Sequence, residues 1–293
     1  MRPELAWGER TYVMGILNVT PDSFSGDGLA RAGRSIDEVV AAALDQACHF
    51  VDAGADILDI GAESSRPAQF YGEHRSISAD EELALAIPVV SAVMDELGDR
   101  ALVSIDTTKS PVARAAVEAG ASIVNDVWAA RRDSEVAIVA ADAGAHLVLM
   151  HNQEHDDYPG GVFDAVVAWL TEAIDAAEAA GVARGRLIVD PGIGFGKTPA
   201  HSVELLHRLR ELKVALGDLP VLVGTSRKRF IGELLGGAPP DQRLEGTAAS
   251  VALAIAAGAD IVRVHDAEPI VKTTHVSDAI VRWRPPEEAA NGR

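Results

Sequence analysis

The apolar residues of the chain gather in eight short runs, which are separated by longer segments of mixed polarity. The runs cover residues 13–17, 57–60, 102–105, 123–124, 147–150, 187–189, 221–223 and 261–264. They are rich in valine, isoleucine and leucine at successive positions, which is typical of parallel strands buried on both faces. The pattern therefore predicts eight buried parallel strands.

The segments between the runs are rich in alanine and carry the start signals of helices. Some begin with a capping box, in which a serine and a later glutamate each bind the other's backbone N–H group. Others begin with a capping residue followed by proline at the first helical position. The boxes are Ser35 with Glu38 and Ser78 with Glu81, and the proline signals are Ser110-Pro111 and Thr198-Pro199.

Four of the helical segments end in the same way. An Ala-Gly-Ala tripeptide at 53–55, 119–121, 143–145 and 257–259 lies one residue before an apolar run. A glycine just past a helix end favours the left-handed conformation, so the tripeptide marks a repeated helix-to-strand connection.

Strands and helices that alternate in this way predict a (β/α)₈ TIM barrel, an α/β fold, as a single domain over residues 1–284. A doubly wound open sheet is the main alternative. The tail at 285–293 is expected to be disordered.

Composition and charge narrow the function. The 293 residues carry a net charge of −18, which argues against broad binding to nucleic acid or to an anionic membrane. A bound anion therefore needs local positive charge, such as the Ser-Arg-Lys-Arg stretch at 226–229. No apolar run reaches the ~18 residues of a membrane span, and the first residues lack a signal-peptide pattern. With a single cysteine as well, a soluble cytoplasmic protein is expected.

Polar residues follow the apolar runs, and the active sites of barrels lie at the carboxyl ends of their strands. The residues at these ends are Asn18, Asp59, Glu63, Asp106, Asn125, Asp126, His151, Asp190, 226–228, Arg263 and His265. Carboxylates and amides can bind the N–H edge of a heterocycle, as proposed for Asp106, Asn125 and Asp190, while Lys228 can donate to ring acceptors. A second group suits an anion with several oxygens: Asn18, Arg66, Arg263 and His265. The sequence therefore predicts a site for a nitrogen-rich ring on a phosphorylated arm.

Two stretches imitate other motifs. Residues 190–198, Asp-Pro-Gly-Ile-Gly-Phe-Gly-Lys-Thr, end like a phosphate-binding P-loop, but Gly192 stands one residue too close to Gly196 for that motif. Residues 151–155 match the H-x-x-E-H zinc pattern, yet they follow a strand where the pattern requires a helix. We expect His151 to form part of the site wall. We expect Lys197 to lie at a helix start with its amine in solvent, and contact with a ligand stays open.

Seven stretches together resemble the dihydropteroate synthase family of pterin-binding enzymes. They are 14–25, 52–68, 103–127, 147–151, 190–197, 222–232 and 246–266, in the family's order. The resemblance implies that para-aminobenzoate displaces pyrophosphate from 6-hydroxymethyl-7,8-dihydropterin pyrophosphate. It also implies a barrel, Mg²⁺ and a homodimer.

The resemblance also implies roles for single residues. The pterin would be held by Asp106, Asn125, Asp190 and Lys228, with Met150 and Phe195 along its faces. The pyrophosphate would be bound by Arg263, His265 and Asn18, with Arg66 added on chemical grounds, and Asn18 would also bind the metal. The mobile loops near the benzoate would include Thr20, Pro21, Asp22, Phe24, Ser65 and Pro67.

The chain departs from the family pattern in its loops. Residues 24–28 read Phe-Ser-Gly-Asp-Gly, which shifts the loop acid to Asp27. Arg229 stands where serine is common, and a guanidinium could pair with the benzoate carboxylate. Two alternatives stay open: a pterin-binding paralogue with altered catalysis, and a methyltetrahydrofolate-dependent methyltransferase. The cations at 226–229 and 263–265 count against the methyltransferase, because a methyl donor has no pyrophosphate for them to hold.

Overall fold

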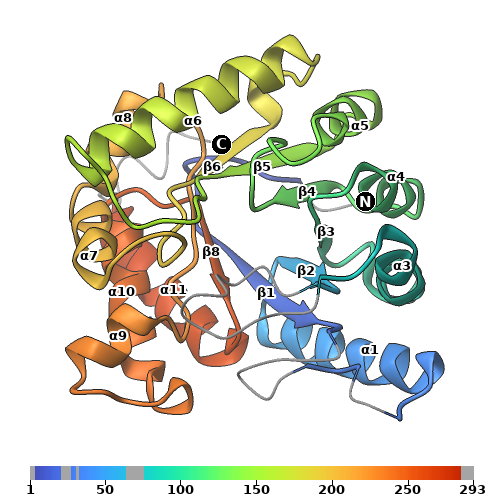
Figure 1. The fold of residues 1–293 in the computed structure, drawn as a ribbon. Helices are drawn as coiled ribbons and strands as arrows, with labels where there is room; N and C mark the ends of the chain where they lie inside the picture. Colours follow the sequence, from blue (N-terminus) through green and yellow to red (C-terminus); the bar gives the residue numbers. More distant parts are fainter. Residues whose placement is uncertain (1–3, 21–27, 31–32, 64–75, 285–293) are drawn as a thin grey trace.

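Eight parallel strands surrounded by helices form the protein (Figure 1). The computed structural model describes residues 4–20, 28–30, 33–63 and 76–284. The strands are β1 (Tyr12–Asn18), β2 (Ile57–Gly61), β3 (Leu102–Asp106), β4 (Ile123–Asp126), β5 (His146–Met150), β6 (Leu187–Asp190), β7 (Leu222–Val223) and β8 (Ile261–Val264). Each lies on one of the predicted apolar runs, so the strand prediction is confirmed.

The sheet closes on itself. Its strand order is β6-β5-β4-β3-β2-β1-β8-β7, so β6 and β7 are the two ends of the paired strands. A parallel bridge joins Val189 to Val221 across these ends, and the Val189 amide donates to the Pro220 carbonyl over 2.9 Å. The predicted barrel is therefore confirmed, and the open-sheet alternative is wrong.

The helices form the outer layer (Figure 1). They are α1 (Ile36–Ala53), α3 (Ala79–Leu97), α4 (Ser110–Glu118), α5 (Glu135–Ala143), α6 (Val162–Ala179), α7 (Pro199–His207), α8 (Leu209–Ala215), α9 (Arg229–Leu234), α10 (Leu244–Ala256) and α11 (Ala267–Val281). Short 3₁₀ turns precede β6 and α10, at Arg184–Arg186 and Pro240–Gln242. Within the described ranges, none of these helices combines the length and apolar character that a bilayer span requires.

Several helix boundaries follow from local chemistry. The capping boxes that begin at Ser35 and Ser78 are both formed, and Thr198 caps α7 ahead of its proline. The prediction for Ser110 is wrong, because Lys109 is the capping residue and Ser110 is already helical. The cause is Asp133, whose carboxylate accepts from the Ser110 amide over 2.7 Å and replaces a capping side chain. The predicted left-handed glycines all have positive φ: Gly54, Gly120, Gly144 and Gly258.

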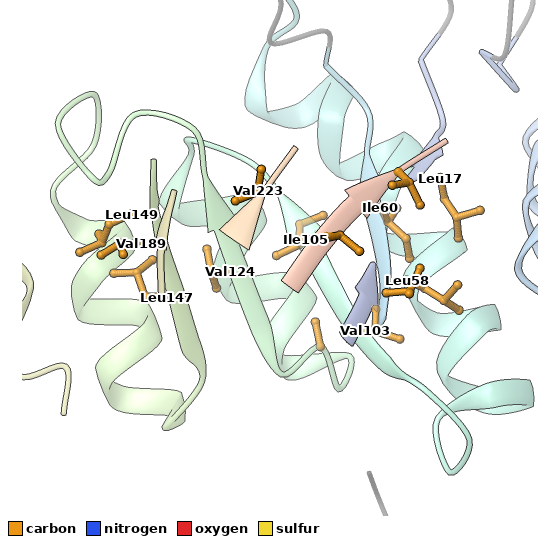
Figure 2. Close-up of a cluster of buried hydrophobic side chains, with 14 of the residues drawn as sticks. Leu17, Leu58, Ile60, Val103, Ile105, Val124, Leu147, Leu149, Val189 and Val223 are labelled. Atoms are coloured by element: carbon orange, nitrogen blue, oxygen red, sulfur yellow. The ribbon is translucent and has the colours of Figure 1, made fainter. Parts of the chain in front are cut away.

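Side chains alternate between the two faces of the barrel wall and give two apolar cores. The outer core lies between strands and helices, and Leu58, Ile105 and Leu147 are among its members (Figure 2). The inner core fills the barrel with Tyr12, Met14, Ile57, Ile123, Val148, Ile188, Leu222 and Ile261. Because side chains repeat with a period of two, residues two positions beyond the inner core point into the same interior.

Residues 5–7 lie against the barrel at the amino ends of its strands, which we call the lower end; the carboxyl ends of the strands form the upper end. Leu5 and Trp7 pack against the inner core, and the Trp7 ring lies edge-on to His146 with centroids 5.9 Å apart. His146 is 8% exposed, and its Nε2 lies 3.0 Å from Nη1 of Arg186. Burial, with a smaller contribution from the Arg186 charge, lowers the pKa of His146 to about 4.

This depressed pKa predicts a loss of stability in mild acid. Between pH 6.5 and about 4, the unfolded chain protonates His146 while the folded chain keeps it neutral, so stability falls as pH falls. At about 1.4 kcal/mol per pKa unit, the contribution lost is about 3 kcal/mol. Urea unfolding at pH 7 and pH 4.5 measures it, and His146→Gln should reduce the pH dependence. The exposed His275→Gln is the control, and equal pH dependence in all three proteins would contradict the assignment.

Candidate active site

A buried polar network lies above the inner core, at the carboxyl ends of the strands. Asp59 of β2 is its centre and has no exposed surface. Its Oδ1 accepts from Ser104 Oγ over 2.6 Å, and its Oδ2 accepts from Asn125 Nδ2 over 3.1 Å. The Nε of Arg263 donates to the same Oδ2 over 2.6 Å. Four strands, β2, β3, β4 and β8, are thus joined across the barrel interior.

Arg263 extends the network to a second carboxylate. Its second nitrogen, Nη2, donates to Oδ2 of Asp106 over 2.7 Å, so one guanidinium is shared by Asp59 and Asp106. Burial raises the pKa of Asp106 to about 8, because desolvation disfavours its charge more than Arg263 favours it. The nearby Asp59 charge acts in the same direction as burial. Arg263 thus holds the carboxyl groups of two neighbouring strands, β2 and β3, side by side at this end of the barrel.

Asp190 and Lys228 bring a further carboxylate and cation to this end of the barrel. Oδ1 of Asp190, at the end of β6, accepts from the Gly192 amide over 2.7 Å. Burial raises the pKa of Asp190, against the opposing charge of Lys228. The Lys228 amine donates to the Ile193 carbonyl and lies 4.7 Å from the centroid of the Phe195 ring. The predicted residues Asp190, Lys228 and Phe195 are thus brought together.

An apolar patch accompanies these polar groups. Val127, Met150 and Phe195 form a separate buried cluster, and Trp128 packs against it. Met150 ends β5 and Phe195 belongs to the turn after β6, so the patch joins neighbouring strand ends. Flat apolar surface beside fixed donors and acceptors is an arrangement that suits a planar polar ring.

Three of the four predicted anion-binding residues lie at the ends of β1 and β8: Asn18, Arg263 and His265. Asn18 is half-buried at the end of β1, where its carbonyl accepts from Leu29. Nδ1 of His265 lies 3.0 Å from Ser226 Oγ, which also accepts from the His265 amide over 3.2 Å. This contact ties the end of β8 to the segment after β7.

Of the residues predicted near the benzoate, the structure describes only Thr20 and Arg229. Thr20 is buried, and the Nε of Arg229 is 3.6 Å from Oε1 of Glu233 on the same helix. The remaining predicted loop residues lie outside the described ranges: Pro21, Asp22, Phe24, Asp27, Ser65, Arg66 and Pro67. Their roles stay predictions.

Three strand-end residues serve the fold. The Asp126 carboxylate points away from the network and accepts from the Trp128 and Ala130 amides over 2.7 and 2.9 Å. Glu63 accepts from Ser76 Oγ and from the Lys109 amine. His151 is 1% exposed and contacts Lys197. Lys197 itself is buried, so the expectation of a solvated amine is wrong.

Sequence reasoning noted Asp59 only as a strand-end residue and did not assign it a role. The signal was present, because a charged residue inside an otherwise apolar strand must be paired when it is buried. Ser104, which occupies the same layer on β3, was also missed. A small hydroxyl in a buried strand carries no comparable signal.

The comparisons with known proteins agree with this geometry. Residues 14–265 match the family model described as pterin binding enzyme. The dihydropteroate synthase of Bacillus subtilis is 44% identical over 277 residues, which span 94% of this chain and 91% of the relative. The chain belongs to the dihydropteroate synthase family.

Solved structures of dihydropteroate synthases have the same fold. The Clostridium difficile enzyme, in the presence of pteroic acid, gives a TM-score of 0.86 at 42% identity, over 95% of this chain and 100% of that one. The Xanthomonas albilineans dihydropteroate synthase, with 4-aminobenzoic acid, gives 0.83 at 41% identity, over 94% and 95%. In both cases the likeness covers more than nine-tenths of this chain.

The network predicts a marked loss of stability for Asp59→Asn. The neutral amide leaves the partly buried Arg263 with one carboxylate instead of two, and removing the fully buried member of a charge pair costs about 3 kcal/mol or more. Urea unfolding measures the loss. Asp52→Asn is the matched control, because Asp52 on α1 pairs with Arg100 at the surface, where both side chains are exposed, and its loss should cost about 1 kcal/mol or less. Equal losses in the two variants would contradict the central role of Asp59.

Proposed function

We propose that the protein is a dihydropteroate synthase that joins 6-hydroxymethyl-7,8-dihydropterin pyrophosphate to para-aminobenzoate. The aniline nitrogen forms a bond to the methylene carbon of the pterin, and the bond from that carbon to the pyrophosphate oxygen breaks. Pyrophosphate leaves with the electron pair, and the new secondary amine loses a proton. The observation that carries the proposal is the gathering of Asp106, Asn125, Asp190 and Lys228 around one barrel end beside Phe195.

The pterin is proposed to bind through its polar edge and its faces. Asp190 and Asp106 would accept from ring and exocyclic N–H groups, and Asn125 can both donate and accept. Lys228 already lies above Phe195, where it can donate to a ring oxygen or nitrogen. Met150 and Phe195 offer the apolar contact that a planar ring requires.

The pyrophosphate is proposed to bind on the β1 and β8 side, through Arg263, His265, Asn18 and Arg66. The bonds from Arg263 to Asp59 and Asp106 use two of the five N–H donors of a guanidinium, so the side chain can also meet an anion. Negative charge grows on the leaving oxygens as the carbon–oxygen bond breaks, and fixed cations there favour the transition state.

Mg²⁺ is the proposed metal, and the donors at this end of the barrel fit it. In the described ranges, no three His, Cys, Asp or Glu side chains converge into a metal cluster. Mg²⁺ in phosphate sites commonly takes few protein ligands and completes its shell with substrate phosphates and water. The side-chain oxygen of Asn18 would serve as such a ligand. When bound, the ion would neutralise charge on the leaving pyrophosphate.

The benzoate is proposed to lie beside the loop residues Thr20, Pro21, Asp22, Phe24, Asp27, Ser65 and Pro67. Arg229 is proposed to meet the benzoate carboxylate. It begins α9 directly after Lys228, and its partner Glu233 is half-exposed at 3.6 Å, so the guanidinium can exchange partners. Arginine binds carboxylates through two parallel N–H bonds, which would orient the aniline nitrogen.

Pyrophosphate release tests the reaction. The purified protein should release pyrophosphate from the pterin substrate only when para-aminobenzoate and Mg²⁺ are present, and EDTA should abolish the release. Lys228→Ala should raise the Kd for 6-hydroxymethylpterin at least tenfold, because the hydrogen-bond donor to the pterin ring is lost. Release that is independent of the benzoate, or no release, would overturn the proposal. Pterin binding without release would favour the altered paralogue, and methyl transfer from methyltetrahydrofolate would favour the other alternative.

We further propose a cytoplasmic homodimer that associates through α10 and α11. These helices pack side by side (Figure 1). Their outer face carries large apolar side chains that are 62–71% exposed: Leu253, Val276 and Ile280, followed by Trp283 at 70%. An exposed apolar group of this kind on a barrel wall is typical of an interface between subunits.

Sedimentation equilibrium tests the dimer. The wild-type protein should have twice the chain mass of 30.7 kDa, and Leu253→Glu should shift it towards the single-chain mass. Ile138→Glu is the matched control, since Ile138 is an exposed apolar residue on α5, across the barrel from α10 and α11 (Figure 1). A dimer that survives Leu253→Glu, or one that Ile138→Glu disrupts equally, would place the interface elsewhere.

A further inference from the structure

Lys197 carries a buried amine that the proposed reaction does not use. It is 2% exposed and is among the largest fully buried side chains of the described residues. Lysine is almost never buried to this degree without a partner that justifies it. Because water does not reach the side chain, a ligand at the barrel end would not contact its amine.

The amine has two acceptors. Nζ of Lys197 lies 2.8 Å from His151 Nδ1 and donates to the Phe195 carbonyl over 2.9 Å. Burial lowers the pKa of His151 to about 2, so the imidazole is neutral, and its Nδ1 can accept when the proton is on Nε2. Burial also lowers the pKa of Lys197. An uncharged amine still has two hydrogens, so both contacts persist in either charge state.

The glycine turn after β6 is pressed against the chain after β5. Gly192 has φ +67°, and a Cβ there would lie 1.9 Å from the His151 carbonyl oxygen. Gly196 has φ +52°, and its Cβ would lie 2.3 Å from the Gln153 carbonyl oxygen. The hydroxyl of Tyr158 donates to the Gly196 carbonyl over 2.7 Å. The Lys197 contacts therefore link the turn after β6 to the segment after β5. These two segments lie so close together that only glycine fits at positions 192 and 196.

The same turn carries two groups of the pterin site. The Gly192 amide donates to Asp190, so the start of the turn orients that carboxylate. The carbonyl that Lys197 binds belongs to Phe195, whose ring lies under the Lys228 amine. A shift of the turn would therefore move the Phe195 ring, the Asp190 carboxylate and the Lys228 amine together.

We propose that Lys197 is a positioning residue for pterin binding, which acts through Phe195 and the Asp190 turn without touching the substrate. The inference rests on the proposed function. It predicts that loss of the amine weakens pterin binding above all, because the groups that the turn holds, Asp190 and Phe195, both belong to the proposed pterin site.

Three variants test the proposal. Lys197→Met keeps the length of the side chain and removes both hydrogen bonds, so the Kd for 6-hydroxymethylpterin should rise at least tenfold. The KM for para-aminobenzoate should change less than twofold. Lys197→Gln retains a two-hydrogen donor and should recover part of the pterin affinity. Lys213→Met is the control, because Lys213 makes a comparable lysine contact with Asp260 and the Gly258 carbonyl, just before β8 begins. It should lower stability and leave the Kd unchanged.

A double-mutant cycle separates positioning from a general loss of stability. If Lys197 acts through Phe195, the effects of Lys197→Met and Phe195→Leu on the pterin Kd should fall short of additivity. His151→Phe removes the other acceptor while keeping a ring, and it should weaken pterin binding in the same direction. This variant also serves if Lys197→Met does not fold.

The outcomes distinguish the inference from the function beneath it. Wild-type protein that binds pterin, together with a Lys197→Met variant of unchanged Kd and lower stability, would overturn the inference alone. Full additivity with Phe195→Leu would do the same. A wild-type protein that neither binds pterin nor releases pyrophosphate would overturn the proposed function and this inference with it.

Discussion

The paired charges inside the barrel are the constraint on which the rest of the site depends. Asp59 is fully buried, and a carboxylate in such a place must be neutralised and hydrogen-bonded or its desolvation destabilises the fold. Ser104, Asn125 and Arg263 meet that requirement from three other strands. The orientation of Arg263 then follows, and so does its contact with Asp106. Donors and acceptors are held in place by the barrel wall itself, so little reorganisation is needed when charge develops on a substrate.

The two ends of the barrel are built differently. At the lower end, carboxylates satisfy backbone amides: Asp56 accepts from Val13, and Asp260 accepts from Val221. Trp7 packs against the inner core at that end. At the upper end the carboxylates and cations face one another across the interior. This division between a stabilising end and a reactive end is general for the (β/α)₈ fold.

The sequence was enough for the architecture and for most of the groups at the upper end. Eight apolar runs became eight strands, because buried parallel strands need apolar residues on both faces. Asn125 and Asp126 show what local sequence alone does not reveal, which is the direction of each side chain at a strand end. They are adjacent polar residues at one strand end, and the period of two sends Asn125 inward and Asp126 to the turn.

Contacts between distant segments account for the errors. Ser110 looked like a capping residue, but Asp133 from the next connection took over its amide. Lys197 follows a glycine turn and precedes a helix, a position that suggests solvent. Its burial depends on His151, 46 residues away, and no local pattern encodes that distance.

The glycine turn after β6 also limits which substitutions the chain can accept. Its alternating glycines face the His151 carbonyl, the Lys228 side chain and the Gln153 carbonyl in succession. No residue with a Cβ fits at Gly192 or Gly196 unless the chain after β5 moves away. A side chain at either glycine is therefore tolerated only together with a shift of the chain after β5, so each connection limits the sequence of the other. This limit acts between two connections that α6 and β6 separate in the chain.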